Sequence, residues 1–166
     1  MRDGGAATKL MQVRALCDRP LLFGDRGWLI AGRIHDVWLD PAVQRVAAFE
    51  VHDCARGEFV CVAPFTLRAN PHLESGLDAD PETWTQLDRA PHWTSARSIE
   101  EVIIVSGDGD WSCDVTDAEC DPLTWRLVRY RIRRPRWRIF GRRTLAANVV
   151  VGSSADAMIV DKEKIA

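Results

Sequence analysis

The sequence predicts an all-β protein built from two tandem copies of one small unit. Three observations support this prediction: apolar and polar residues alternate along several short segments, turn signals separate these segments, and helical periodicity is rare. The chain has 166 residues, of which 46% are hydrophobic and 28% charged, as is typical of a globular protein with a sizeable core. Short strands divided by turns favour a small barrel or sandwich.

An internal repeat indicates the two units. DVWLDPAVQRVAAFEVHD (36–53) aligns without gaps on DAECDPLTWRLVRYRIRR (117–134), with an Asp-Pro turn and an arginine at matching places. Two shorter blocks follow in the same order: FTLRAN matches RTLAAN, which ends at Asn148, and SIEEVIIV, which ends at Val105, resembles SADAMIVD. From these alignments we expect an N-terminal extension (1–19), a first unit (20–107) and a second unit (108–166).

Each unit is expected to contain the same elements. The Asp-Pro turn sets a chain reversal, because proline fixes φ and the aspartate accepts hydrogen bonds from nearby amides. A strand of period two follows, then a tight connection, a second strand, and a third that ends in branched apolar residues. The first unit carries an insertion (71–97) rich in Pro, Asp and His. Within it, Asp80-Pro81-Glu82 predicts the start of a short helix that packs on the barrel through Trp84 and Leu87.

These segments resemble the PRC-barrel family. The resemblance rests on GRIHDVWLDPAVQRVAAFEV, VAPFTL and EEVIIV, and it covers most of residues 27–105 and, more weakly, the chain from Asp117 onward. The family includes the cytoplasmic domain of the photosynthetic reaction-centre H subunit and the C-terminal domain of the ribosome maturation factor. The resemblance implies two small PRC-barrel-like units and binding to protein or to a membrane surface. The second unit departs from the pattern, with Gly-Arg-Arg at 141–143 where the first has Ala-Pro-Phe.

Positive charge is concentrated in RLVRYRIRRPRWRIFGRR (126–143), although the chain has a net charge of −2. Alternation predicts one apolar face, with Val128, Tyr130, Ile132, Trp137 and Ile139, which belongs to the core. The opposite face is basic and includes Arg129, Arg131, Arg133, Arg136 and Arg138, with Arg134 beside it. The first unit carries Ala48, Glu50, His52 and Asp53 at the positions matching Arg129, Arg131, Arg133 and Arg134, so the fold does not require arginine there.

Two interpretations of the arginines remain open. The acidic residues just upstream offer neutralisation within the chain; they are Asp108, Asp110, Asp114, Asp117, Glu119 and Asp121. Alternatively, the arginines bind a partner, since a guanidinium group forks onto carboxylate or phosphate and is favoured at interfaces. That partner would be an acidic protein surface, anionic lipid headgroups or, less favoured by the resemblance, RNA. Trp93 and Trp137 are the aromatic candidates for the same contact.

The sequence contains no catalytic motif. Ser106–Asp110 (SGDGD) lacks the spacing of a phosphate loop or a calcium loop, and GSS at 152–154 is not a nucleophile elbow. The five cysteines are dispersed and have no zinc spacing, so we expect reduced thiols and no cofactor. No segment approaches a signal peptide or the roughly 20 apolar residues of a membrane span.

The sequence thus predicts a non-catalytic accessory or assembly subunit. We expect it to dock from the cytoplasm on the inner face of a membrane complex, with a photosynthetic reaction centre suggested by the family resemblance alone. Its partners would be protein subunits of that complex and anionic lipid headgroups. Two alternatives are an RNA- or ribosome-associated maturation factor and a free-standing homodimeric adaptor.

Overall fold

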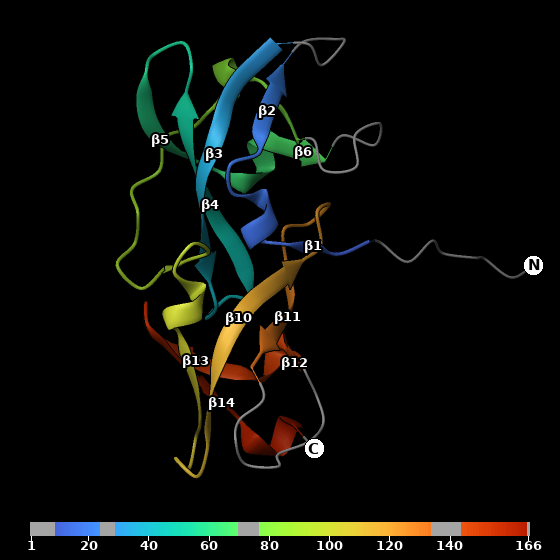
Figure 1. The fold of residues 1–166 in the computed structure, drawn as a ribbon, viewed down its shortest axis with the longest axis vertical. Coiled ribbons are helices and arrows are strands. Elements are labelled where there is room, and N and C mark those ends of the chain that lie inside the picture. Colours follow the sequence, from blue (N-terminus) through green and yellow to red (C-terminus); the bar gives the residue numbers. More distant parts are fainter. Residues whose placement is uncertain (1–8, 24–28, 70–76, 134–143, 166) are drawn as a thin grey trace, which may run out of the picture.

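The chain is all-β, as its sequence predicts. Figure 1 shows the computed structural model, which describes residues 9–23, 29–69, 77–133 and 144–165. Within these residues, fourteen strands form two curled seven-stranded sheets, one in the upper half of the figure and one in the lower half. The helices of the described chain are short 3-10 turns: η1 (Arg14–Leu16), η2 (Pro64–Thr66), η3 (Pro81–Thr83), η4 (Ile99–Glu101), η5 (Ala147–Val149) and η6 (Lys162–Ile165).

The first sheet has the strand order β5-β4-β3-β2-β7-β6, and β8 pairs with β3. Strands β2 and β7 are parallel, whereas the other neighbours are antiparallel. The bounds of these strands are β2 (Pro20–Phe23), β3 (Leu29–Asp40), β4 (Arg45–Asp53), β5 (Glu58–Val62), β6 (Leu67–Ala69), β7 (Leu77–Ala79) and β8 (Thr94–Ser95).

The second sheet repeats this order as β12-β11-β10-β9-β14-β13, with β1 paired to β10. Its one parallel pair, β9 with β14, corresponds to β2 with β7. Each strand from β1 to β7 therefore has a counterpart among β8 to β14. The bounds are β1 (Met11–Gln12), β9 (Ile103–Ser106), β10 (Ser112–Cys120), β11 (Leu127–Ile132), β12 (Thr144–Ala146), β13 (Val150–Ser153) and β14 (Ala157–Val160).

The first strand of each set is exchanged between the two sheets. Strand β1 precedes the first sheet in the chain but pairs with β10 of the second, and β8 precedes the second sheet but pairs with β3 of the first. The hydrogen bonds that follow are equivalent: the Val13 amide donates to Ala118 O at 2.9 Å, and the Ala96 amide donates to Val37 O at 2.8 Å. The two halves are thus tied together by reciprocal arms.

A buried aspartate fixes each arm. Asp36 is 5% exposed and accepts from the Arg97 amide at 3.2 Å, and Asp117 is 8% exposed and accepts from the Arg14 amide at 3.3 Å. Each carboxylate also accepts from the amide of the next residue, at 2.7 Å in both cases. Burial raises the pKa of Asp117, although these two amides and nearby arginines act in the opposite direction.

The strand register confirms the first of the three repeat alignments. Asp36 pairs with Glu50 between β3 and β4, and Asp117 pairs with Arg131 between β10 and β11. Two register shifts interrupt each of these ladders at corresponding positions. A bulge moves the side chains beyond it to the other face of the strand, so the two copies share irregularities as well as regular pairing.

The other two alignments are wrong. Val62 pairs with Phe49 and Leu145 pairs with Tyr130, so the counterpart of Leu145 is Val62, whereas the sequence alignment matches it to Leu67. The segment SADAMIVD contains β14, which lies beside β9 in the sheet and is the counterpart of β7. Strand β9, placed at the end of the first unit by the sequence, belongs to the second sheet. Short branched apolar runs look alike whichever strand they form, and this similarity produces the wrong match.

The predicted helix of the insertion is a single 3-10 turn. Asp80 caps it as expected, because its carboxylate accepts from the amide two residues later at 3.0 Å. After η3 the chain is extended and pairs with the edge of β5, where the Leu87 amide donates to Cys61 O at 2.9 Å. Pairing an exposed strand edge replaces the helix. Trp84 packs against the core, as expected, but from an extended segment.

One hydrophobic core runs through both sheets. Where the halves meet, the Val46 amide donates to Trp125 O at 2.8 Å and the Leu127 amide donates to Gln44 O at 2.9 Å. Gln44 and Trp125 are counterparts and share a left-handed backbone, with φ of 55° and 56°. A local two-fold relation therefore passes through this junction.

Candidate functional site

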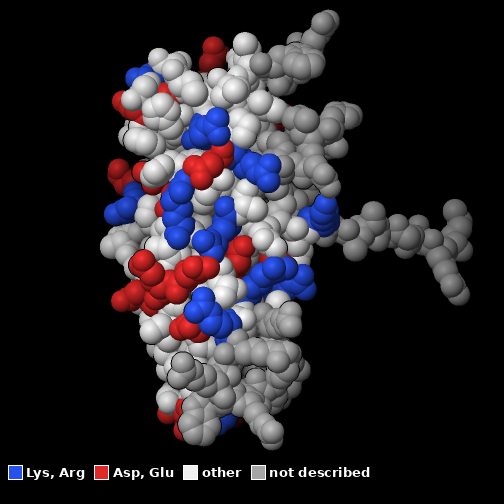
Figure 2. All heavy atoms as spheres, in the orientation of Figure 1, with Lys and Arg blue, Asp and Glu red and all other residues white. Residues whose placement is uncertain are grey.

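The arginine strand β11 pairs with a carboxylate of its own chain. Arg129 and Arg131 both donate through Nε to Glu119, the second at 2.7 Å. The Glu119 side chain is 5% exposed, whereas the two arginine side chains are 46% and 47% exposed. On the face drawn in Figure 2, basic and acidic side chains lie next to one another. The geometry of this pair matches the interpretation of neutralisation within the chain.

The two guanidinium groups set the ionisation of Glu119. Partial burial raises the pKa of this carboxyl, but the hydrogen bonds and charges of Arg129 and Arg131 outweigh burial and lower it. Glu119 is therefore an anion at neutral pH, as the pairing requires. Arg133 lies 4.0 Å from Asp114, and both side chains are more than half exposed, so this contact is weak.

The predicted apolar face of β11 is partly wrong. Tyr130 is fully buried and Ile132 packs against the core, but Val128 is 40% exposed and Leu127 is buried instead. The bulge opposite Cys120 places Leu127 and Tyr130 on the same side despite their three-residue spacing. Strict alternation of side chains along a strand does not predict such a bulge.

The structure does not place Trp93 beside the arginines of β11, and the other predicted partner-binding residues lie outside the part of the chain that it describes. Trp93 is half-buried and lies edge-on to the ring of His92, with centroids 6.4 Å apart. His92 in turn contacts Asp40, with Nε2 and Oδ2 3.4 Å apart. Arg134, Arg136, Trp137 and Arg138 lie outside the described residues.

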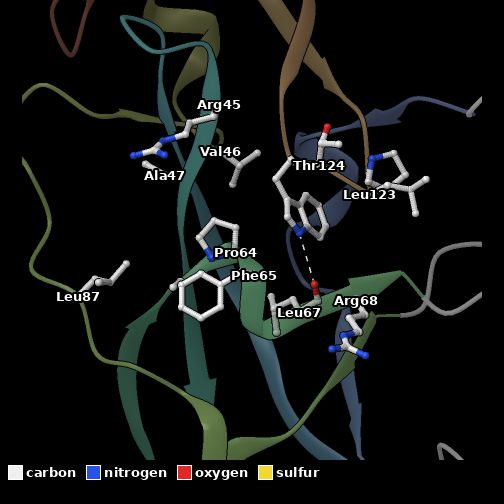
Figure 3. Close-up of a pocket in the computed structure, with 13 residues that line it drawn as sticks. Arg45, Val46, Ala47, Pro64, Phe65, Leu67, Arg68, Leu87, Leu123 and Thr124 are labelled. Carbon is white, nitrogen blue, oxygen red and sulfur yellow. Dashed lines mark hydrogen bonds between the residues drawn. The ribbon is translucent and has the colours of Figure 1, made fainter.

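A cleft of about 680 Å³ opens at the junction of the two halves, and we call it the first cleft (Figure 3). Strand β4, η2 and β6 form one wall, and the turn between β10 and β11 forms the other. Phe65 and Leu123, one from each wall, are 75% and 74% exposed. The lining residues are Arg45, Val46, Ala47, Ala63, Pro64, Phe65, Leu67, Arg68, Leu87, Pro122, Leu123, Thr124 and Trp125.

Trp125 holds the two walls of the first cleft together. Its side chain comes from the second half, is 5% exposed and meets Phe49 of the first half edge-on, with ring centroids 5.0 Å apart. Its indole N–H donates to Leu67 O at 3.4 Å, the dashed line in Figure 3. A large aromatic residue with its N–H satisfied fixes the position of the turn that carries Leu123.

A second cleft, of about 360 Å³, is the counterpart of the first. It is lined by Gln44, Asp121, Thr124, Arg126, Leu127, Val128, Ala146 and Asn148. The strand register and the matching 3-10 turns place Asn148 where the first cleft has Phe65. In the aligned Asp-Pro turns, Ala42 is the counterpart of Leu123 and Gln44 is the counterpart of Trp125. The two clefts have similar backbones and each contains an arginine, Arg45 or Arg126, but the large apolar residues Phe65 and Leu123 have polar or small counterparts.

Sequence reasoning missed the first cleft. The contrasts at positions 42 and 123 and at 44 and 125 are visible in the first repeat block, and they are the signal that could have indicated it. The contrast between Phe65 and Asn148 was hidden, because the second block aligns Phe65 with Arg143.

Among the described residues, the lining of the first cleft contains no His, Cys, Asp or Glu side chain. Burial raises the pKa of Cys17 and Cys113 to about 11 and that of Cys120 to about 12, so these thiols stay protonated at neutral pH. In the parts of the chain that the structure describes, no cluster of three or more His, Cys, Asp and Glu side chains could ligate a metal. No helix of the described residues has the length and apolar character to cross a membrane.

Comparison with known proteins adds no assignment. The sequence matches no protein-family model and no curated protein sequence. The resemblance to PRC-barrel proteins therefore stays a prediction from the motifs.

Proposed function

We propose that this chain is a non-catalytic accessory subunit that binds another protein through the first cleft. The observation that carries the proposal is the exposure of Phe65 and Leu123, at 75% and 74%. At the counterpart positions the same fold carries Asn148 and Ala42, so folding does not require large apolar side chains there. Exposed apolar side chains around a cleft are typical of a protein-binding surface.

The resemblance to PRC-barrel proteins favours a particular kind of host. We propose a membrane complex, and first a photosynthetic reaction centre, with the chain docked on its cytoplasmic face. The paired arginines of β11 fit a supporting role in this arrangement, because about half of each guanidinium side chain remains accessible for the edge of an interface.

Affinity purification of the tagged chain from its source cells tests the proposal. The Phe65→Asn/Leu123→Ala variant gives the first cleft the residues found at the counterpart positions, Asn148 and Ala42. A matched Phe59→Asn/Leu29→Ala variant removes apolar side chains that are 56% and 63% exposed elsewhere. We expect the wild type and the matched variant to retain a common set of proteins that the cleft variant loses. With a membrane host, that set contains subunits of a membrane complex.

Two results would contradict the proposal. Equal retention by all three proteins would show that the first cleft is not the binding surface. Retention of ribosomal proteins in place of membrane subunits would leave the cleft as the binding surface but replace the proposed host with a ribosomal one.

A further inference from the structure

We propose that the first cleft binds an extended peptide segment in which acidic side chains alternate with large apolar ones. This inference rests on the proposed function and adds the chemistry of the partner. The apolar side chains would pack on Phe65, Leu123 and the turn held by Trp125, and the carboxylates would pair with Arg45 and Arg68.

The charge part of the inference comes from the arginines that lack a partner. No ion pair, hydrogen bond or ring contact joins the guanidinium groups of Arg45, Arg68 and Arg126 to another described residue. The other arginines of the described chain all have such a contact: Arg14, Arg19, Arg33, Arg56, Arg89, Arg97, Arg129, Arg131 and Arg133. Among the described residues, the unpartnered arginines lie in the two clefts, whereas Arg129 and Arg131 of the predicted basic strand share Glu119.

The position of these arginines does not help the fold. Arg45 and Arg126 face each other in an antiparallel bridge where the two halves join. Like charges directly opposite one another destabilise a sheet, so their presence favours an anion supplied from outside. Figure 3 shows Arg45 and Arg68 on opposite sides of Phe65, so one apolar contact would be flanked by two cations.

The surface beside Phe65 extends beyond the first cleft. A side groove of about 500 Å³ shares Phe65, Arg68 and the η2 turn with it and continues to Leu22 and Phe23 of β2. A partner that occupies both the first cleft and the side groove must be elongated, and an extended peptide segment has this shape. Asp78 and Asp80 also line the side groove, and Asp78 lies opposite Arg68 in the β6–β7 register, so we expect Arg45 to contribute more than Arg68.

Selection of random peptides displayed on phage against the immobilised full chain tests the inference. Peptides that also bind the Phe65→Asn/Leu123→Ala variant are removed, and the remaining sequences are read. We expect them to be rich in Asp and Glu interleaved with Leu, Ile and Phe. The best peptide is then synthesised with its acids intact and with each acid replaced by its amide, and the affinities of both forms are measured by fluorescence anisotropy.

The acidic form should bind about tenfold more tightly than the amide form, and raising the salt concentration should reduce this difference. The Arg45→Gln/Arg68→Gln variant should lose the preference while it binds the amide form as the wild type does. Arg56→Gln changes an arginine that is 66% exposed outside the cleft and should alter neither affinity.

The outcomes separate this inference from the proposed function. If the selected peptides are neutral or basic but depend on Phe65 and Leu123, the acidic partner is overturned and the binding cleft stands. If no peptide discriminates between the wild type and the Phe65→Asn/Leu123→Ala variant, the cleft is not a peptide site and this inference is overturned, while the affinity purification decides the proposed function separately.

Discussion

The two clefts of this protein differ where their backbones agree. Both lie beside an Asp-Pro turn, a residue with positive φ and a 3-10 turn. The first cleft exposes Phe65 and Leu123, whereas the counterpart positions hold Asn148, which lines the second cleft, and Ala42, which does not. Because the same fold forms with either set of residues, folding does not require large apolar side chains at these positions. The fold does not require Phe65 and Leu123 at the first cleft, and this supports the proposal that they bind a partner.

The same comparison gives a different answer for Trp125. Its counterpart Gln44 is half-buried, whereas Trp125 is 5% exposed and packs on Phe49 across the junction. Trp125 therefore has a structural role that Gln44 lacks, and the two clefts differ in their floor as well as at their rim.

The largest expected effect belongs to Trp125. Its replacement by alanine leaves a cavity between the halves and should lower the free energy of unfolding by about 3–5 kcal/mol. Gln44→Ala, the matched change in the second cleft, should cost less than about 1 kcal/mol. Urea unfolding of both variants checks the difference, and equal costs would mean that Trp125 does not join the halves.

The two exchanged arms should contribute equally to the free energy of unfolding. Leu16 follows β1 and Ile99 follows β8, and the two side chains are 1% and 0% exposed at corresponding places. Each change to alanine should lower the unfolding free energy by about 2–5 kcal/mol, with similar values for the two. Thermal and urea unfolding provide the measurement. A large cost at one position and none at the other would show that only one arm is a structural tie.

Glu119 should contribute less, and its contribution should depend on pH. Glu119→Gln leaves two arginines without their anion and should cost about 1–3 kcal/mol at neutral pH. Because the folded protein lowers the pKa of Glu119, its stabilisation is complete above the unfolded pKa and is lost as the pH falls from about 5 through the folded pKa.

Urea unfolding from neutral to acidic pH tests this dependence by comparing the wild type with Glu119→Gln. The two curves should converge as the pH falls. The raised pKa of Asp117 has the opposite effect on stability, but it is present in both proteins and cancels in the difference. A difference that is independent of pH would mean that the Glu119 charge does not stabilise the strand.

The smallest expected effect on stability belongs to the cleft rim. Phe65→Asn/Leu123→Ala should change the unfolding free energy by less than about 0.5 kcal/mol, because both side chains are mostly exposed. Calorimetric melting of the variant and the wild type provides the check. A large loss would show that these residues stabilise the fold, and the comparison with Asn148 and Ala42 would lose its meaning.

Part of this structure can be predicted from the sequence. The all-β class and the first repeat block follow from alternation and from the Asp-Pro turns, which are local signals. The exchange of β1 and β8 does not, because pairing with a distant strand leaves no mark on a two-residue segment. The helix predicted after Asp80 fails for a similar reason: its cap is a local signal, but the edge of β5 that recruits the following residues is not.

The candidate site was harder to predict than the fold. Arg129 and Arg131 belong to an alternating pattern that is visible in the sequence. Their pairing depends on Glu119 of the neighbouring strand, which the pattern does not reveal. Arg45 and Arg68 are isolated arginines in the sequence, and they are distinguished only by the absence of a contact between their guanidinium groups and other described residues.

Exchange of rim residues between the two clefts tests the central claim most directly. The affinity of the selected acidic peptide is measured for the wild type, for Phe65→Asn/Leu123→Ala and for Ala42→Leu/Asn148→Phe. The account predicts that the first variant binds about tenfold or more weakly, while the second keeps the wild-type affinity for the first cleft. Unchanged binding by the first variant would contradict the claim that the exposed apolar rim of the first cleft exists to bind a partner.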